Sequence, residues 1–324
     1  DGQTERPTVQ IAQLLERLVR QPFNGSEQDG VIRCLDRPGR DMKRPTTPEI
    51  EQTPICLVHA SVPYQMFESF YDSEDHPLND PIDERAAWSL VRAVPLGGVR
   101  RASPTQVHHH RNPDVWLQVD PAGRWTASGE MEDAARALFD LYLPLQLDPD
   151  LVIGQIGQSL DGRIATEGGQ SHYVTGPADI RRLHRLRALV DAVVVGSGTV
   201  AADNPRLTVR EIEGQNPVRV VLDPHDRLSP DRAVFCDGAA PTLVVHGAAG
   251  RSDHSAGVDL LVLPDDAPES NNTDDSRIRF APATVLEALR ARGLRRILVE
   301  GGGITVSRFL EAGALTRLHV TVAP

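Results

Sequence analysis

The second half of the chain alternates short apolar runs with amphipathic stretches. Seven runs from Leu151 onward predict strands: Leu151–Ile156, Ala192–Val195, Val218–Leu222, Thr242–Val245, Asp259–Leu263, Ile297–Val299 and Leu318–Val322. Apolar spacings of three and four residues between them predict helices over Ala178–Val190, Pro282–Arg292 and Thr305–Ala312. Strands that are apolar on both faces and linked by helices indicate an α/β fold, with a mainly parallel sheet and helices on both faces.

The first half has a different sequence pattern, because residues 1–147 are irregular and rich in proline. Their patterns predict helices at Val9–Arg20, Pro81–Val94 and Glu130–Tyr142, and strands at Thr53–Val62 and Asp114–Val119. We therefore expect a smaller, irregular α+β domain of unknown function over 1–147 and the α/β domain over 148–324.

Composition limits the classes of protein to which the chain can belong. A length of 324 residues fits two domains, and a net charge of −11 argues against a surface that binds nucleic acid or anionic membrane. The three cysteines are odd in number and far apart, which is typical of a reducing compartment. With no long apolar run and no signal-peptide pattern, we expect a cytoplasmic protein without a membrane partner.

Two glycine loops follow predicted strands. Gly301–Gly303 comes directly after Glu300, and Gly196-Ser-Gly198 precedes Thr199. The Gly301–Gly303 loop matches neither G-x-G-x-x-G nor a Walker A motif, so it is either a phosphate site or a tight turn. A third polar loop starts at Ser159. Because ligands of open α/β sheets lie at the carboxyl ends of the strands, the three loops predict one cleft.

The helix predicted at Ala178–Val190 carries several arginines. Its apolar arc comprises Ile180, Leu183, Leu186 and Val190. We expect the arginines outside this arc to face solvent, namely Arg181, Arg182 and Arg185. Arg187 falls inside the arc and needs a partner, which is either an anionic ligand or a structural ion pair.

Adjacent histidines rarely share one tetrahedral metal site, so His108–His110 is expected to be a solvated loop and no metal is predicted.

Taken in order, seven segments resemble the reductase domain of the bifunctional riboflavin-biosynthesis deaminase/reductase family. They are Ser159-Leu-Asp-Gly-Arg-Ile-Ala165, Gly169-Gln-Ser-His-Tyr-Val-Thr-Gly176, Leu186-Arg-Ala188, Val195-Gly-Ser-Gly-Thr-Val200, Ala202-Asp-Asn-Pro-Arg-Leu-Thr-Val-Arg210, Arg219-Val-Val-Leu-Asp223 and Val299-Glu-Gly-Gly-Gly303. The resemblance implies a dihydrofolate-reductase-like sheet, NADPH as hydride donor, and 5-amino-6-(5-phosphoribosylamino)uracil as the phosphorylated pyrimidine substrate. Its ribosyl group would be reduced at C1′ to a ribityl chain.

The same resemblance assigns site residues. Those expected to contact substrate are Ser171, Arg187, Leu207, Arg210 and Glu300, with the arginines suited to the phosphate. Those expected to contact the cofactor are Gly157, Tyr173, Thr199, Asp203, Pro224, Gly302, Gly303, Ile304 and Thr305. Asp203 and Glu300 are candidates for the catalytic proton donor, and the resemblance also implies a homodimer.

The chain departs from the family in three ways. Gln155 stands where the family commonly has Lys. The zinc motifs of the partner deaminase are absent, so no deaminase activity is expected. The family continues into further strands beyond residue 324, so the last strands are expected to be missing. Two alternatives stay open: a reductase of another pyrimidine or a pterin, and a non-catalytic nucleotide-binding module.

Overall fold

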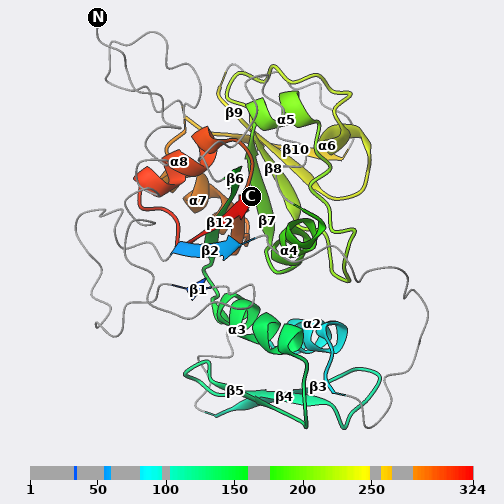
Figure 1. Ribbon diagram of the computed structural model, residues 1–324. Coiled ribbons are helices and arrows are strands. Elements are labelled where there is room, and N and C mark those ends of the chain that lie inside the picture. The colour runs from blue at the N-terminus through cyan, green and yellow to red at the C-terminus, as the bar shows by residue number, and fades with distance from the viewer. Residues whose placement is uncertain are drawn as a thin grey trace, which may run out of the picture. The chain divides into compact units, whose positions relative to one another are not determined.

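A computed structural model describes residues 33–34, 55–59, 81–96, 103–159, 176–248, 257–264 and 280–323 (Figure 1). The predicted helix at Val9–Arg20 and the expected site residues Ser171 and Tyr173 lie outside these ranges. The chain divides into two compact units, one of residues 63–151 and one of residues 1–62 with 152–324. Within the described ranges, no helix is both long enough and apolar enough for a membrane crossing.

The larger unit is built on one sheet with the strand order β1-β2-β12-β6-β11-β7-β8-β9-β10. All neighbouring pairs are parallel except β1 with β2, which confirms the mainly parallel sheet. The strands are β1 (Arg33–Cys34), β2 (Ile55–His59), β6 (Val152–Ser159), β7 (Ala192–Gly196), β8 (Val218–Leu222), β9 (Thr242–His246), β10 (Val258–Val262), β11 (Ile297–Val299) and β12 (Arg317–Ala323). Each predicted strand from Leu151 onward is present within three residues of its expected ends.

Strands β1 and β2 come from the first 62 residues, yet they extend the large sheet beside β12. Residues Ile55–His59 pair with Leu318–Val322 in a parallel register. The sequence suggested a domain boundary between residues 147 and 148, and the smaller unit ends nearby at Leu151. The sequence did not suggest that a segment from the first 62 residues would join the large sheet.

One face of the large sheet carries an apolar core. Helices α7 (Pro282–Ala291) and α8 (Gly303–Glu311) pack on it through Val285, Leu289, Val306 and Phe309, against strand residues such as Val194. Gly154 of β6 makes this packing possible. A Cβ at that position would lie 2.8 Å from Leu315 Cδ1, closer than real contacts allow.

Helix α4 (Pro177–Ala188) packs on the other face of the sheet, where the buried side chains are partly polar. The expectation that Arg182 faces solvent is wrong, because its side chain is buried and pairs with Asp179. It also donates to His319 and Thr321 of β12. Helical periodicity located an apolar arc, but the sheet presents polar side chains to α4 and these bind the arginine. Short helices α5 (Ser197–Asp203) and α6 (Ala233–Cys236) complete this unit.

In the smaller unit, helices α2 (Glu84–Ala93) and α3 (Asp133–Leu147) contact each other, and three antiparallel strands form a separate sheet. These strands are β3 (Thr105–His108), β4 (Trp116–Val119) and β5 (Trp125–Ala127). The expected end of α3 at Tyr142 is too early, since the helix continues through Pro144. The buried side chains of Leu143, Leu145 and Leu147 favour the extra turn despite the missing amide.

Candidate functional site

The two glycine loops interlock at the carboxyl ends of neighbouring strands β7 and β11. A Cβ on Gly301 would lie 2.6 Å from Thr199 Oγ1, and a Cβ on Gly196 would lie 2.7 Å from Thr305 Oγ1. Each loop therefore places a glycine against a threonine of the other. Gly301 also has φ +101°, which L side chains rarely adopt. The contact fixes the entry into α8 relative to the entry into α5.

The first turn of α8 presents backbone amides at this point. The Gly302 amide donates to Thr199 Oγ1 at 2.8 Å, and the Thr305 amide donates to the Gly302 carbonyl. Among the described residues, no partner is assigned to the amides of Gly303 and Ile304. No side chain caps the helix, so an anion can accept from these two amides at its positive end.

Arg187 and Glu300 form a buried ion pair beside the glycine loop. Arg187 Nε donates to Oε1 at 2.8 Å and Nη2 donates to Oε2 at 2.7 Å, while Nη1 donates to the Thr208 carbonyl. Burial alone lowers the pKa of Arg187, but the charge and hydrogen bonds of Glu300 outweigh it and raise that pKa. The structural ion pair, left open by the sequence, is thus present. Of the five guanidinium N–H groups, one on each terminal nitrogen has no partner among the described residues.

The loop of residues 204–210 brings two more expected substrate residues beside this pair. Leu207 is buried and has φ +56°, a strained backbone conformation for a leucine. Arg210 is exposed, donates to Thr208 Oγ1, and forms no ion pair with any described residue. Burial, together with the charges of Arg187 and Arg206, lowers the pKa of Arg210. The positive charges of Arg187 and Arg206 therefore lie close enough to Arg210 to interact with it.

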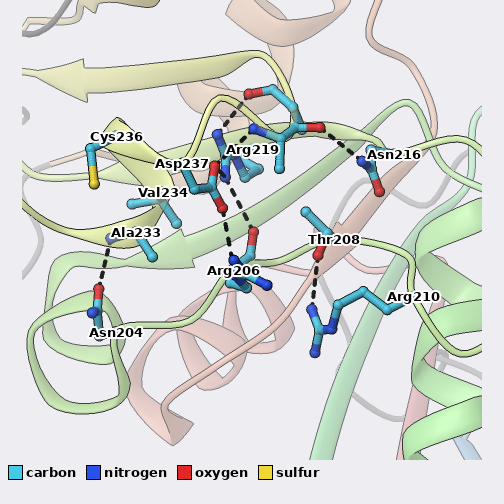
Figure 2. A network of polar contacts seen from close by, with 12 residues as sticks. Asn204, Arg206, Thr208, Arg210, Asn216, Arg219, Ala233, Val234, Cys236 and Asp237 are labelled. Carbon is cyan, nitrogen blue, oxygen red and sulfur yellow. Dashed lines mark hydrogen bonds and ion pairs between the residues drawn. The ribbon is translucent and has the colours of Figure 1, made fainter.

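A network of polar contacts fixes this loop to the adjacent strands (Figure 2). Arg219 of β8 is 1% exposed and donates to Asp237 Oδ1 at 2.7 Å, and its Nη1 also contacts the Arg206 carbonyl at 3.4 Å. Asn204 Oδ1 accepts from the Ala233 amide, and Asn216 links the Val209 amide to the Ala239 carbonyl. The loop conformation, including the strain at Leu207, is thus set by neighbours outside the loop.

His184 was not predicted from the sequence. It lies on α4 and binds the backbone of the loop of residues 204–210. Its Nδ1 accepts from the Arg210 amide at 2.8 Å, so the ring is neutral with its proton on Nε2. Burial lowers the pKa of His184 to about 4, and the charges of Arg187 and Arg210 add to this effect. The motif Leu186-Arg-Ala188 gave no signal for this histidine, because its partner lies in a loop 26 residues away.

The other expected cofactor residues do not all lie at the interlocked loops. Gly157 lies in β6 opposite Thr321, and Asp203 is the half-buried last residue of α5. Pro224 follows β8, and its carbonyl accepts from the Gly247 amide. Gly157 thus lies beside the polar face under α4 rather than at the interlocked loops. Among the residues that the structure describes, no group of three His, Cys, Asp or Glu side chains could hold a metal ion.

The chain is similar in sequence to a known family and to several known proteins. The RibD C-terminal domain family matches residues 150–324. The 2,5-diamino-6-ribosylamino-4(3H)-pyrimidinone 5′-phosphate reductase of Methanothermobacter thermautotrophicus is 35% identical over 180 residues, which are 53% of this chain and 77% of that protein. The riboflavin biosynthesis protein RibD of Bacillus amyloliquefaciens is 30% identical over 64% of this chain and 54% of that one. The chain thus spans about half the length of that RibD protein. The solved structure of Acinetobacter baumannii RibD is 26% identical, with a TM-score of 0.45 over 60% of this chain and 53% of that one.

The interlocked loops generate a prediction about stability. Gly301→Ala should lower the free energy of unfolding by about 1–3 kcal/mol, because alanine is strained at this φ and its Cβ meets Thr199. Gly302→Ala is the matched control, since φ is −59° there and its Cβ would lie 3.5 Å from Thr199 Oγ1. Urea denaturation followed by far-UV circular dichroism measures both. Equal stability of the two variants would contradict the interlock.

His184 generates a prediction about pH. The unfolded chain takes up a proton below the ordinary histidine pKa of 6.5, whereas folded His184 stays neutral until about pH 4. Its contribution to stability is therefore complete above pH 6.5 and is lost as the pH falls toward 4, by at most about 1.4 kcal/mol per unit. His184→Asn keeps an acceptor at the δ1 position but does not titrate, so it should show a shallower loss.

The measurement compares urea denaturation of the parent and His184→Asn between pH 7.5 and 4.5. Far-UV circular dichroism is the appropriate signal, because Trp88, Trp116 and Trp125 all lie in the smaller unit, and tryptophan fluorescence does not report on the larger one. Parallel pH profiles for the two proteins would contradict the neutral, acceptor role of His184.

Proposed function

The chain belongs to the RibD C-terminal domain family through residues 150–324, and from that premise we propose that it is an NADPH-dependent reductase of a phosphorylated ribosylaminopyrimidine. The substrate is 5-amino-6-(5-phosphoribosylamino)uracil or a close analogue, and the reaction converts its ribosyl group to a ribityl chain. The observation that carries this proposal is the meeting of the interlocked glycine loops with the Arg187–Glu300 pair and Arg210 at one sheet edge.

The glycine loops fit a dinucleotide. The amides of Gly303 and Ile304 begin a helix without a side-chain cap, and Gly302 has no side chain to separate an anion from them. Thr199 holds Gly302 in place through its hydroxyl. These groups are suited to the pyrophosphate of NADPH, which when bound would supply the hydride. The chain's own task is then to hold donor and acceptor together.

Arg210 is the residue best suited to the substrate phosphate. Glu300 already neutralises Arg187, whereas Arg210 is exposed and has no ion-pair partner among the described residues. Arg187 keeps Glu300 in place and has two N–H groups left for an acceptor on the substrate. Glu300 is less suited to proton donation than the sequence suggests, because both carboxylate oxygens accept from Arg187. Asp203 stays a candidate proton donor.

Two alternative functions are compatible with the same fold and differ in what the site does. A different pyrimidine or a pterin would fit the same loops, and a non-catalytic module would bind the nucleotide without turnover. A homodimer and a cytoplasmic location are further proposals, which rest on the resemblance and on the cysteine usage.

Turnover provides the main test. The purified chain should oxidise NADPH in the presence of 5-amino-6-(5-phosphoribosylamino)uracil or its 2,5-diamino-pyrimidinone counterpart, followed by the loss of absorbance of the reduced nicotinamide. Dihydrofolate is the control substrate and should give no oxidation above background. Saturable NADPH binding without oxidation on any of these compounds would instead support the non-catalytic module.

A second test separates the two exposed arginines of the loop. Arg210→Ala should raise KM for the phosphorylated substrate about tenfold or more, which corresponds to the loss of a charge-assisted hydrogen bond, and should leave KM for NADPH nearly unchanged. Arg206→Ala is the matched control, because its side chain is 61% exposed and contacts Asp237 only at 3.9 Å. An equal effect of both substitutions, or an effect of Arg210→Ala on NADPH alone, would rule out the phosphate role.

A further inference from the structure

Two of the chain's three cysteines lie opposite each other in the large sheet. Strands β1 and β2 pair in an antiparallel register, in which Cys34 is the partner of Cys56 (Figure 1). Residues 35–55 separate the two cysteines in the sequence. The third cysteine, Cys236, is exposed in the short helix α6 and takes part in no disulfide. The fold therefore brings one pair of cysteines together and leaves the third elsewhere.

The spacing of an antiparallel pair suits a disulfide. Residues directly opposite each other have Cα atoms about 4.5 or 5.5 Å apart, depending on whether the two residues exchange hydrogen bonds. Cysteines joined by a disulfide have Cα atoms roughly 4.4–6.8 Å apart. Both kinds of pair fall within this range, so a bond between Cys34 and Cys56 requires no change of register.

The next position in the same row of the sheet is a histidine with an unused donor. His319 of β12 is the register partner of Cys56, so both cysteines lie on the face of the sheet to which His319 belongs. Arg182 Nη1 contacts His319 Nδ1 at 3.2 Å, and a guanidinium can only donate. Nδ1 is therefore the acceptor, and Nε2 carries the proton. This Nε2–H is buried and has no hydrogen-bond partner among the described residues.

His319 stays neutral, so it acts as a hydrogen-bond donor rather than as a cation. Burial lowers its pKa well below the usual value, and the charges of Arg182 and Arg317 lower that pKa further. A donor without a partner favours an anion nearby, and the anion of a cysteine is the thiolate that attacks disulfides. The strand of Cys56 adjoins β12, whereas that of Cys34 is one strand further away. Cys56 is therefore the stronger nucleophile of the pair.

We propose that Cys34 and Cys56 form a reversible disulfide by exchange with a small disulfide such as oxidised glutathione. The Cys56 thiolate attacks one sulfur of that compound, releases the first glutathione thiolate and becomes a mixed disulfide. The Cys34 thiol then loses its proton and attacks the Cys56 sulfur, which releases the second glutathione thiolate. The two protein thiols give up two electrons and two protons, and the two glutathione sulfurs take them up.

A reversible bond is compatible with the reducing compartment expected from the cysteine usage, because intracellular disulfides are usually transient and redox-sensing. The bond would close a loop over residues 35–55 and tie β1 to β2, the strand that pairs with β12. Strand β12 pairs in turn with β6, which carries the expected cofactor residue Gly157. The proposal does not depend on the reductase function.

Intact mass distinguishes one bond between the two residues from separate modification of each. Full-length Cys236→Ser, incubated with oxidised glutathione, should lose both thiols and retain no glutathione, because the second thiol displaces the first glutathione adduct. Digestion without reductant should then release a pair of peptides joined through Cys34 and Cys56. Two retained glutathiones, two unreacted thiols or a bond between two chains would overturn the proposal.

Single-cysteine variants in the same background test the order of attack. Cys34→Ser should trap one glutathione on Cys56, and Cys56→Ser should trap one on Cys34 about tenfold more slowly, because only Cys56 adjoins His319. Far-UV circular dichroism of the reduced proteins checks that the variants keep the parent fold. Equal rates in the two variants would contradict the assignment of Cys56 as the attacking thiol.

Hydrogen exchange measures what the bond does to the sheet. The amides of Ile55–His59 should exchange about tenfold more slowly in the oxidised protein, because the bond restricts the opening of β1 and β2, and dithiothreitol should restore the faster rate. The amides of Thr242–His246, in β9 near the other end of the strand order, are the internal control and should not change. The same exchange at Ile55–His59 in both forms would overturn the restraint on β2.

Discussion

Two arginines of helix α4 are buried against the sheet, and each is neutralised by a carboxylate within hydrogen-bond distance. Arg187 pairs with Glu300 of the glycine loop, and Arg182 pairs with Asp179 of its own helix. Removing one partner of such a pair typically costs about 3–5 kcal/mol, because the other charge stays buried and uncompensated. Helix α4, the end of β11 and strand β12 are therefore held in one arrangement by charge as much as by apolar packing.

The buried ion pair between Arg187 and Glu300 also orders the candidate site. Glu300 fixes Arg187, which in turn donates to the Thr208 carbonyl and so holds the loop of residues 204–210. Arg219 and Asp237 hold the same loop at Arg206 (Figure 2). A strained residue such as Leu207 persists only where its surroundings over-determine its conformation, and these contacts provide that.

Most of the larger unit could be predicted from the sequence, because strands buried on both faces and amphipathic helices leave clear patterns. The glycine loops and Arg187 were also visible as candidates. Several other features were not, and three of them depend on tertiary contacts. The continuation of α3 through Pro144 depends on tertiary burial, and the burial of Arg182 depends on polar partners in a distant strand. His184 has its partner in a loop remote in sequence. For the burial of Arg182, the sequence does contain a signal. In β12, His319 and Thr321 alternate with apolar residues, which is unusual for a strand buried on both faces.

The reciprocal packing of the two glycine loops has a consequence for protein engineering. Since Gly301 lies against Thr199 and Gly196 lies against Thr305, the space available to one loop is defined by the side chains of the other. Libraries that randomise either loop by itself would therefore return mostly inactive variants. Substitutions in the two loops would have to be made in pairs, and their energies would be strongly non-additive.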